Sequence, residues 1–171
     1  MCKIITQMLT FEQMLINLIV ALALGALIGV EREFAGKEAG IRTSMLVAGG
    51  AAIFSMIALA LPFLIGKDVT NFAQAITVQN AGFLNIIANI VVGIGFLGAG
   101  IIIKNKNHVH GLTTAADIWM TSAIGVLVGI GLVQFAVVSA IIISGLLFLF
   151  RKMKVSERID KDFPGKDDDS S

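Results

Sequence analysis

One acid stands inside an apolar stretch of this sequence, and it is the sharpest candidate for chemistry. Asp117 falls within residues 113–133, a run that is otherwise free of charged side chains. An acid inside a membrane segment costs about 2.5–3.5 kcal/mol, so it is expected to face other helices or water rather than lipid. Asp117 therefore has two interpretations. It is either an interfacial acid favoured by the positive N-terminus of its helix, or a cation or proton site.

Small and polar side chains recur at intervals of four residues in the apolar segments, which places them on one face of a helix. The positions are Gln13, Asn17, Ala21, Gly25 and Gly29, then Asn85, Asn89 and Gly93, then Thr113, Asp117, Thr121, Gly125 and Gly129, with a weaker version at Ser44, Ala48, Ala52 and Ser55. In lipid, close backbone contact and interhelical hydrogen bonds draw such faces together. Two hypotheses follow. The faces only pack the helices, or Asn17, Asn85, Asn89, Asp117 and Thr121 line a polar cavity or an ion path.

The remaining polar motifs give weaker signals. His108 and His110 alternate in a turn, but a zinc site needs a third and a fourth ligand, and no cysteine is near them. The glycine-rich run 93–98 shares spacing with a dinucleotide fingerprint, yet it lies in an uncharged apolar run that no strand precedes. No nucleophile and base stand in a recognisable constellation. The sequence therefore predicts a protein that is not an enzyme, that has no cofactor and that offers no confident metal site.

The composition is that of a membrane protein. Hydrophobic residues make up 56% of the chain and charged residues 15%, with a mean hydropathy of +0.88, whereas a soluble domain is about a quarter charged. A membrane span needs about 20 apolar residues. The candidate spans are residues 13–30, 43–65, 81–103, 113–133 and 135–150. We expect an all-α, polytopic transmembrane bundle of about five helices, in which Gln134 joins the last two as an antiparallel hairpin.

The basic residues predict the orientation of this bundle. They are concentrated after the first span (Arg32, Lys37, Arg42), after the third (Lys104, Lys106) and after the fifth (Arg151, Lys152, Lys154). With five helices these segments share one side, and the positive-inside rule assigns that side to the cytoplasm. The N-terminus is then outside and the C-terminus inside. We expect one transmembrane domain over 1–152, a disordered polar tail over 153–171, an outside loop over 67–80 with a turn around Phe72 and Ile76, and no β-strand.

Charged and hydroxyl residues cluster where the first and fourth spans meet this cytoplasmic side. Residues 43–44 (Thr-Ser) offer an N-cap for the second helix. One hypothesis is an ion pair here, either Glu31 with Arg42 or Arg32 with Asp117. The alternative is a solvated turn whose basic residues reflect only the positive-inside rule.

Four motifs stand in a fixed order along the chain, at residues 25–36, 39–49, 93–101 and 111–119, the last continuing to Gly131. The residues that characterise these motifs are Gly25, Gly29, Glu31, Arg32, Arg42, Thr43, Gly93, Gly95, Gly98, Gly100, Gly111, Thr113 and Trp119. In these motifs the chain resembles the MgtC/SapB family of bacterial inner-membrane proteins. The resemblance covers roughly residues 11–150, which is the membrane domain without the C-terminal ACT-like domain that many members carry.

The resemblance implies a multi-pass protein of the bacterial inner (plasma) membrane. The family is associated with virulence, through survival of pathogens inside host cells, and with growth at low magnesium and inhibition of the proton-translocating ATP synthase. It implies a regulator of magnesium, ion and membrane-energy homeostasis that acts through other membrane proteins, with the ATP synthase or a transporter as partner. Besides the lipid bilayer, a homo-oligomer is a further expected partner, and nucleic acid is not.

The alternative function is a cation transporter or channel, for magnesium or coupled to protons, with Asp117 lining the path. A weaker alternative is a structural subunit that needs a soluble partner. A cavity open to the cytoplasm in which Asp117, Asn85 and Asn89 converge would favour transport. A dry, glycine-packed core with an exposed helix groove would favour the regulator.

Overall fold

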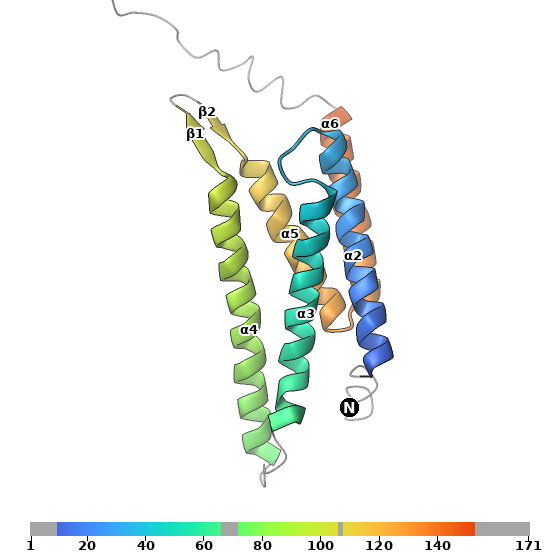
Figure 1. Cartoon of the computed structure of the whole chain (residues 1–171), viewed down its shortest axis with the longest axis vertical. Helices are drawn as coiled ribbons and strands as arrows, with labels where there is room; N and C mark the ends of the chain where they lie inside the picture. Colours follow the sequence, from blue (N-terminus) through green and yellow to red (C-terminus); the bar gives the residue numbers. More distant parts are fainter. Residues whose placement is uncertain (1–9, 66–71, 106–107, 153–171) are drawn as a thin grey trace, which may run out of the picture.

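The structure is a bundle of long helices with a short β-hairpin at one end (Figure 1). The computed structural model describes residues 10–65, 72–105 and 108–152. In the labels of Figure 1, the helices are α2 (Phe11–Phe34), α3 (Ile41–Ile65), α4 (Phe72–Ile101), α5 (Leu112–Gly129) and α6 (Val133–Lys152), and the hairpin comprises β1 (Ile103–Asn105) and β2 (His108–His110). Among the described residues, five helices are long and apolar enough to cross a membrane. The predicted all-α transmembrane fold is confirmed, and the chain is a multi-pass membrane protein.

The spans follow from hydropathy and backbone chemistry. They are 18 to 24 residues long, against the about 20 residues that cross the hydrocarbon core of a bilayer. Because lipid offers no hydrogen bonds, each crossing segment must satisfy its own backbone as a helix. The α2–α3 connection, the β-hairpin and the end of α6 gather at one end of the bundle (Figure 1). These are the segments whose basic residues predict a cytoplasmic location, and we refer to this end as the cytoplasmic end.

Helices α2 and α3 make a close contact through glycine. A Cβ atom on Gly25 would stand 2.5 Å from the carbonyl oxygen of Ser44, and one on Gly29 would stand 2.6 Å from the Cα of Ile41. Real Cβ atoms essentially never come so close. The predicted tight crossing at the 25–29 glycine pair is therefore present, and it packs α2 directly on the backbone of α3.

Helix α5 packs on α3 in the same way. A Cβ atom on Gly129 would stand 2.6 Å from the carbonyl oxygen of Ala52, and one on Gly125 would collide with the carbonyl oxygen of Ala48. Both alanines are fully buried. Small residues from α2, α3 and α5 thus form the tightly packed part of the core, as expected where backbone approach rather than a hydrophobic force holds membrane helices together.

Helices α4 and α6 flank this tightly packed unit. Only 6% of the α4 span Gly82–Ile101 and 11% of the α6 span Val133–Arg151 are buried, compared with 50% of the α3 and α5 spans. Ala136 and Ala140 of α6 are the fully buried exceptions, packed in the core cluster with α2 and α5. Most of the α4 and α6 surface is therefore open to lipid or to other proteins.

Two glycines with positive φ end helices at opposite ends of the bundle. Gly36 (φ 64°) follows α2, and Gly131 (φ 85°) lies between α5 and α6. At the first, Lys37 N–H donates to the carbonyl of Arg32, and at the second, Leu132 N–H donates to the carbonyl of Leu127. This pairing is the Schellman pattern, which a left-handed glycine makes available at a helix C-terminus.

Several predicted boundaries are wrong. Residues 103–105 and 108–110 pair as antiparallel strands, with Ile103 opposite His110, where no strand was expected. The α5–α6 turn is residues 130–132, and Gln134 lies inside α6. Helix α4 already begins at Phe72, so that much of the expected outside loop is helical. Residues 66–71 of that loop and the expected tail over 153–171 lie outside the described residues.

Candidate functional site

Charged and polar side chains meet in the protein interior at the cytoplasmic end of α2 and α5. Arg32 lies in the last turn of α2, and Thr114 and Asp117 lie in the first two turns of α5. The spacing of three residues puts Thr114 and Asp117 on the same face of their helix. These three side chains are 2–4% exposed, a degree of burial that polar groups reach only with partners.

A short chain of contacts connects these residues to the α2–α3 connection. The guanidinium Nη2 of Arg32 donates to the Thr114 hydroxyl at 2.9 Å, and this hydroxyl donates to Oε2 of Glu38 at 3.2 Å. A threonine hydroxyl can accept one hydrogen bond while it donates another. The Nε of Arg32 stands 3.7 Å from Oδ2 of Asp117. We call the four residues Arg32, Glu38, Thr114 and Asp117 the buried polar cluster.

The contact between Arg32 and Asp117 is electrostatic. Among the described residues, neither carboxylate oxygen of Asp117 has a hydrogen-bond partner, and the Nε of Arg32 has none either. Removing one member of a buried ion pair leaves an uncompensated charge, which is strongly unfavourable. The pair therefore neutralises two buried charges without the directional bonds that usually rigidify such a site. Of the two ion pairs that the sequence left open, this is the one that forms among the described residues.

Glu38 is the exposed end of the cluster. A backbone hydrogen bond and the hydrogen bond from Thr114 hold the pKa of its carboxyl below the usual 4.5, with smaller contributions from the charges of Lys37 and Arg32. Glu33, nearby in the chain, accepts a hydrogen bond at 3.1 Å from the backbone N–H of Ile41. Glu33 thus caps α3, and the predicted capping by residues 43–44 is wrong because α3 begins two residues earlier.

The structure separates the residues expected to line one polar cavity or path. Asn17 is buried, but it lies fifteen residues before Arg32 on α2, or about 22 Å away along the helix. Its side chain accepts a hydrogen bond at 3.0 Å from Gln13 of the same helix. Thr121 is fully buried one turn beyond Asp117, with no hydrogen-bond partner for its hydroxyl among the described residues.

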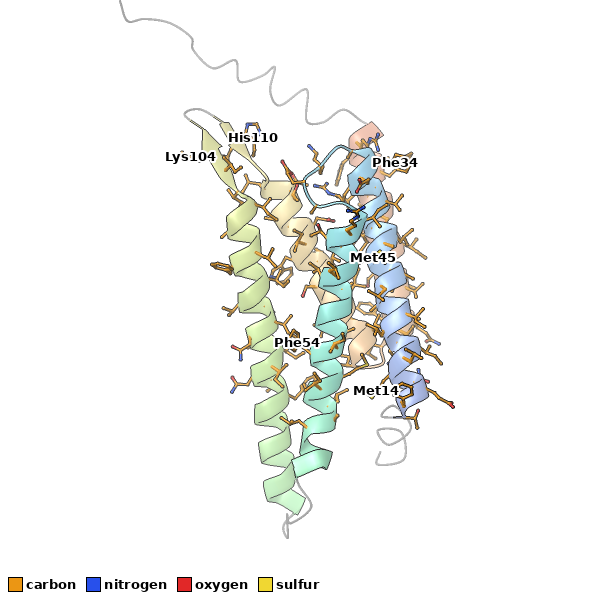
Figure 2. The ribbon with its side chains drawn as sticks, viewed as in Figure 1. Met14, Phe34, Met45, Phe54, Lys104 and His110 are labelled. Atoms are coloured by element: carbon orange, nitrogen blue, oxygen red, sulfur yellow. The ribbon has the colours of Figure 1, made fainter. Side chains whose placement is uncertain are left out.

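Asn85 and Asn89 lie on a different surface altogether. Both are exposed on α4. Asn89 lines a groove of about 740 Å³ between α3 and α4, whose wall also contains Ser122 of α5 and, at the cytoplasmic end, Arg42 and Thr43. Figure 2 shows Phe54 of α3 projecting into the space between these two helices, and it too lines the groove. We call this the α3–α4 groove. Asp117 is not among its lining residues.

Comparison with known proteins places the sequence among bacterial membrane proteins. The family model described as the MgtC family matches residues 18–156. This chain belongs to the MgtC family. It is 39% identical over 155 residues to the protein named MgtC of Salmonella typhimurium strain LT2 (91% of this chain, 58% of that protein). It is 42% identical over 133 residues to MgtC of Brucella abortus (78% and 49%).

A further relative is YhiD of Escherichia coli strain K12, which carries the provisional name of a magnesium transporter. This MgtC-family chain is 34% identical to it over 147 residues, which are 85% of the chain and 63% of YhiD. The chain thus spans about half to two thirds of the length of the curated relatives it matches. No solved structure matches it.

The glycines of the MgtC motifs divide by role in the structure. Gly25 and Gly29 pack α2 on α3, and Gly98 faces Ala115 of α5, where an added Cβ would meet the alanine Cβ at 3.4 Å. At Gly93, Gly95 and Gly100 an added Cβ would meet nothing within 4 Å. At these three glycines of the third motif, the surface of α4 therefore has no close neighbour among the described residues. Gly111, with φ 86°, stands directly before α5 against the carbonyl of Ile101.

Sequence reasoning missed two members of the buried polar cluster. Intervals of four residues selected Thr113, which is exposed along with Trp119, whereas Thr114 is buried beside Asp117. The interval of three residues between Thr114 and Asp117 would have found it. Glu38 is exposed in a connection, and nothing in its spacing signals its contact with Thr114. Within the described residues, no group of three or more His, Cys, Asp and Glu side chains could hold a metal ion.

Proposed function

We propose that this MgtC-family protein is a regulator of magnesium, ion and membrane-energy homeostasis that is not an enzyme and acts by binding other membrane proteins. The names of its relatives support the connection to magnesium. The family resemblance supports the bacterial inner membrane as its location and the ATP synthase or a transporter as its partner. The proposal rests chiefly on one observation: α4 has an exposed face that no other helix among the described residues covers, which we call the open side of α4.

The open side of α4 carries a set of residues suited to contact with another membrane helix. Asn85, Asn89, Val92 and Phe96 follow one another at intervals of three or four residues and so share one face. Val92 is 71% exposed and Phe96 is 84% exposed. Gly93 and Gly100 lie on the same side without close neighbours. Small residues permit close backbone approach between membrane helices, and asparagines form hydrogen bonds across such contacts.

The α3–α4 groove continues this face. Asn89 and Gly93 belong to both, and the rest of the groove wall is mainly aliphatic and aromatic. Its volume of about 740 Å³ is ample for large side chains of a docked helix. In lipid, an asparagine that faces hydrocarbon has no hydrogen-bond partner, whereas a partner helix can supply one. The open face and the groove together support docking of a transmembrane segment at α4.

The second candidate function is transport of a cation along Asp117. Three buried polar groups of α3 and α5 favour it, because the carboxylate of Asp117 and the hydroxyls of Thr121 and Ser44 lack hydrogen-bond partners among the described residues. The guanidinium of Arg32 at 3.7 Å opposes it, since a fixed positive charge beside the carboxylate repels a cation. The two exposed asparagines of α4 also do not converge with Asp117.

Flux measurements separate the two functions. The protein is reconstituted in liposomes, its folding and orientation are verified, and magnesium and proton fluxes are measured for the wild type and for Asp117→Asn. We expect no flux above that of empty liposomes for either protein. A wild-type flux that collapses in Asp117→Asn would overturn the regulator and establish an ion path.

A crosslinking experiment tests the docking surface. A photoreactive residue is placed at Val92 on the open side of α4, and as a matched control at Ile142, which is 55% exposed on α6. We expect a crosslink to another membrane protein in cells from Val92 and none from Ile142. Equal yields from both positions, or a crosslink only to a second copy of this chain, would contradict docking of a partner at α4.

A further inference from the structure

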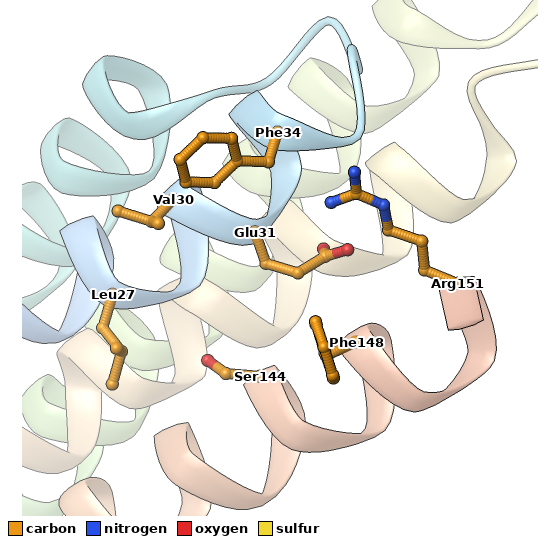
Figure 3. A pocket seen from close by; sticks show the side chains of 7 residues that line it. All are labelled: Leu27, Val30, Glu31, Phe34, Ser144, Phe148 and Arg151. Atoms are coloured by element: carbon orange, nitrogen blue, oxygen red, sulfur yellow. The ribbon is translucent and has the colours of Figure 1, made fainter.

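A second groove lies between α2 and α6, away from the open side of α4 (Figure 3). It has a volume of about 700 Å³, which is within the range of ligand-binding cavities. Leu27, Val30, Phe34 and Phe148 supply its apolar wall. Glu31 and Arg151 supply the charges at its cytoplasmic end, and Ser144 lies deeper. We call it the α2–α6 groove.

The two charged residues of this groove are not paired with each other. The Oε2 atom of Glu31 is buried and has no hydrogen-bond partner among the described residues. Figure 3 shows its carboxylate directed toward the same part of the groove as the guanidinium of Arg151. Within the described part of the chain, no ion pair joins Glu31 to Arg151. A buried carboxylate oxygen without a donor is costly, so the groove offers an acceptor for a ligand cation beside a donor for a ligand anion.

The depth of the α2–α6 groove matches the cytoplasmic leaflet of a bilayer. From Leu27 to Phe34, and from Ser144 to Arg151, its walls extend over eight residues of helix, a rise of about 10 Å from first to last. One leaflet contributes about 15 Å to the hydrocarbon core. Arg151 stands at the end that the positive-inside rule assigns to the cytoplasm. The charged mouth is then at headgroup depth, and the apolar wall lies beside acyl chains.

We infer that the α2–α6 groove binds a phospholipid with an ethanolamine headgroup from the cytoplasmic leaflet. The headgroup phosphate accepts hydrogen bonds from Arg151, because guanidinium and phosphate form strong, charge-assisted hydrogen bonds. The primary ammonium donates to the carboxylate of Glu31. An acyl chain lies along Leu27 and Phe148. A choline headgroup has no N–H to donate to Glu31, and a glycerol headgroup has no cation, so both leave the buried carboxylate oxygen without a partner.

Lipid retention measured by native mass spectrometry tests this inference. The purified protein is equilibrated with equal amounts of phosphatidylethanolamine, phosphatidylcholine and phosphatidylglycerol that carry the same acyl chains. We expect the wild type to retain phosphatidylethanolamine at least about fivefold over the other two, in keeping with one charge-assisted hydrogen bond. Glu31→Gln should reduce this preference to about twofold or less. Arg151→Gln should weaken all three phosphate lipids together, by about tenfold.

Matched substitutions exclude general effects of charge and shape. Glu12→Gln removes an exposed acid at the other end of α2, and Lys104→Gln removes an exposed base on β1; neither should change the lipid preference. Val30→Trp fills the α2–α6 groove without touching its charges and should lower retention of every lipid, whereas Ile142→Trp, outside the groove on α6, should not. Equal retention of the three lipids by the wild type would overturn the inference. An unchanged preference in Glu31→Gln, or unchanged retention in Val30→Trp if Glu31→Gln fails to fold, would also overturn it.

Discussion

The buried ion pair between Arg32 and Asp117 makes a quantitative prediction about stability. Both side chains are almost completely buried, their closest charged atoms are 3.7 Å apart, and neither Nε nor the carboxylate oxygens have hydrogen bonds within the described residues. The perturbation is a double-mutant cycle of Arg32→Met, Asp117→Leu and the double variant. Each single substitution leaves one buried charge without its partner. The double substitution removes both charges.

The magnitudes follow from burial rather than from hydrogen bonding. Removing one member of a buried pair destabilises a protein by about 3–5 kcal/mol, and replacing both members by apolar residues is often neutral or stabilising. Arg32→Met also loses the 2.9 Å hydrogen bond to Thr114, worth about 1–2 kcal/mol for a charged donor. We therefore expect about 3 kcal/mol for Asp117→Leu, slightly more for Arg32→Met, and only about 1–2 kcal/mol for the double variant. The coupling energy is then at least about 4 kcal/mol.

Equilibrium unfolding in mixed micelles measures these differences. The chain contains one tryptophan, Trp119, two residues after Asp117 on α5, and its fluorescence reports on this part of the bundle. Glu12→Gln and Lys104→Gln, which remove exposed charges, serve as controls and should change the free energy of unfolding by less than about 0.5 kcal/mol. Additive single effects, with a coupling energy below about 0.5 kcal/mol, would refute the reasoning that the two charges stabilise each other.

Two further predictions concern packing and pH. Gly125→Ala places a methyl group against the carbonyl of Ala48 and should destabilise the protein by about 1–3 kcal/mol as overpacking does. Gly145→Ala, where an added Cβ meets nothing within 4 Å, is the control and should change the free energy of unfolding by less than about 1 kcal/mol. Equal effects of the two substitutions in unfolding experiments would contradict the tight α3–α5 crossing. Because the pKa of Glu38 in the folded protein lies below its ordinary 4.5, the ionised carboxylate contributes stability above pH 4.5 that is lost as the pH falls through the lowered pKa. The unfolding temperature of the wild type should then fall more steeply below pH 4.5 than that of Glu38→Gln, and parallel curves would show that the ionised carboxylate of Glu38 does not stabilise the folded protein.

The elements that the sequence predicted correctly depend on local properties. Each span is recognisable from the apolar composition of its own segment, and the common end of the basic turns follows from counting charges between spans. The glycine pairs at 25–29 and 125–129 also act locally, since a helix surface without side chains invites close packing wherever it meets a neighbour. The paired strands β1 and β2 were missed because strands of three residues are too short to give an alternating pattern.

The candidate site was harder to predict because it depends on which helices meet. Intervals of four residues place Asn85 and Asn89 on one face of α4, but they do not say whether that face turns toward the core or away from it. In the structure both asparagines are exposed, and Asn89 lines the α3–α4 groove. The same limit explains why Thr113 was selected instead of Thr114. Neighbouring residues differ by about 100° around a helix, and only the position of α2 decides which of the two threonines meets Arg32.

The distribution of close contacts bears on the choice between regulator and transporter. Transport by rocking of helices would require α2, α3 and α5 to slide past one another. At Gly25, Gly29 and Gly129 their backbones are too close for an added Cβ, and such interlocked contacts permit few alternative arrangements. Helix α4 is different, because Gly98 makes only an ordinary close contact with Ala115 and most of its surface is free of neighbours. On the proposed function, a partner docked on α4 would bind close to the buried polar cluster, because Gly98 of α4 contacts Ala115, the residue after Thr114.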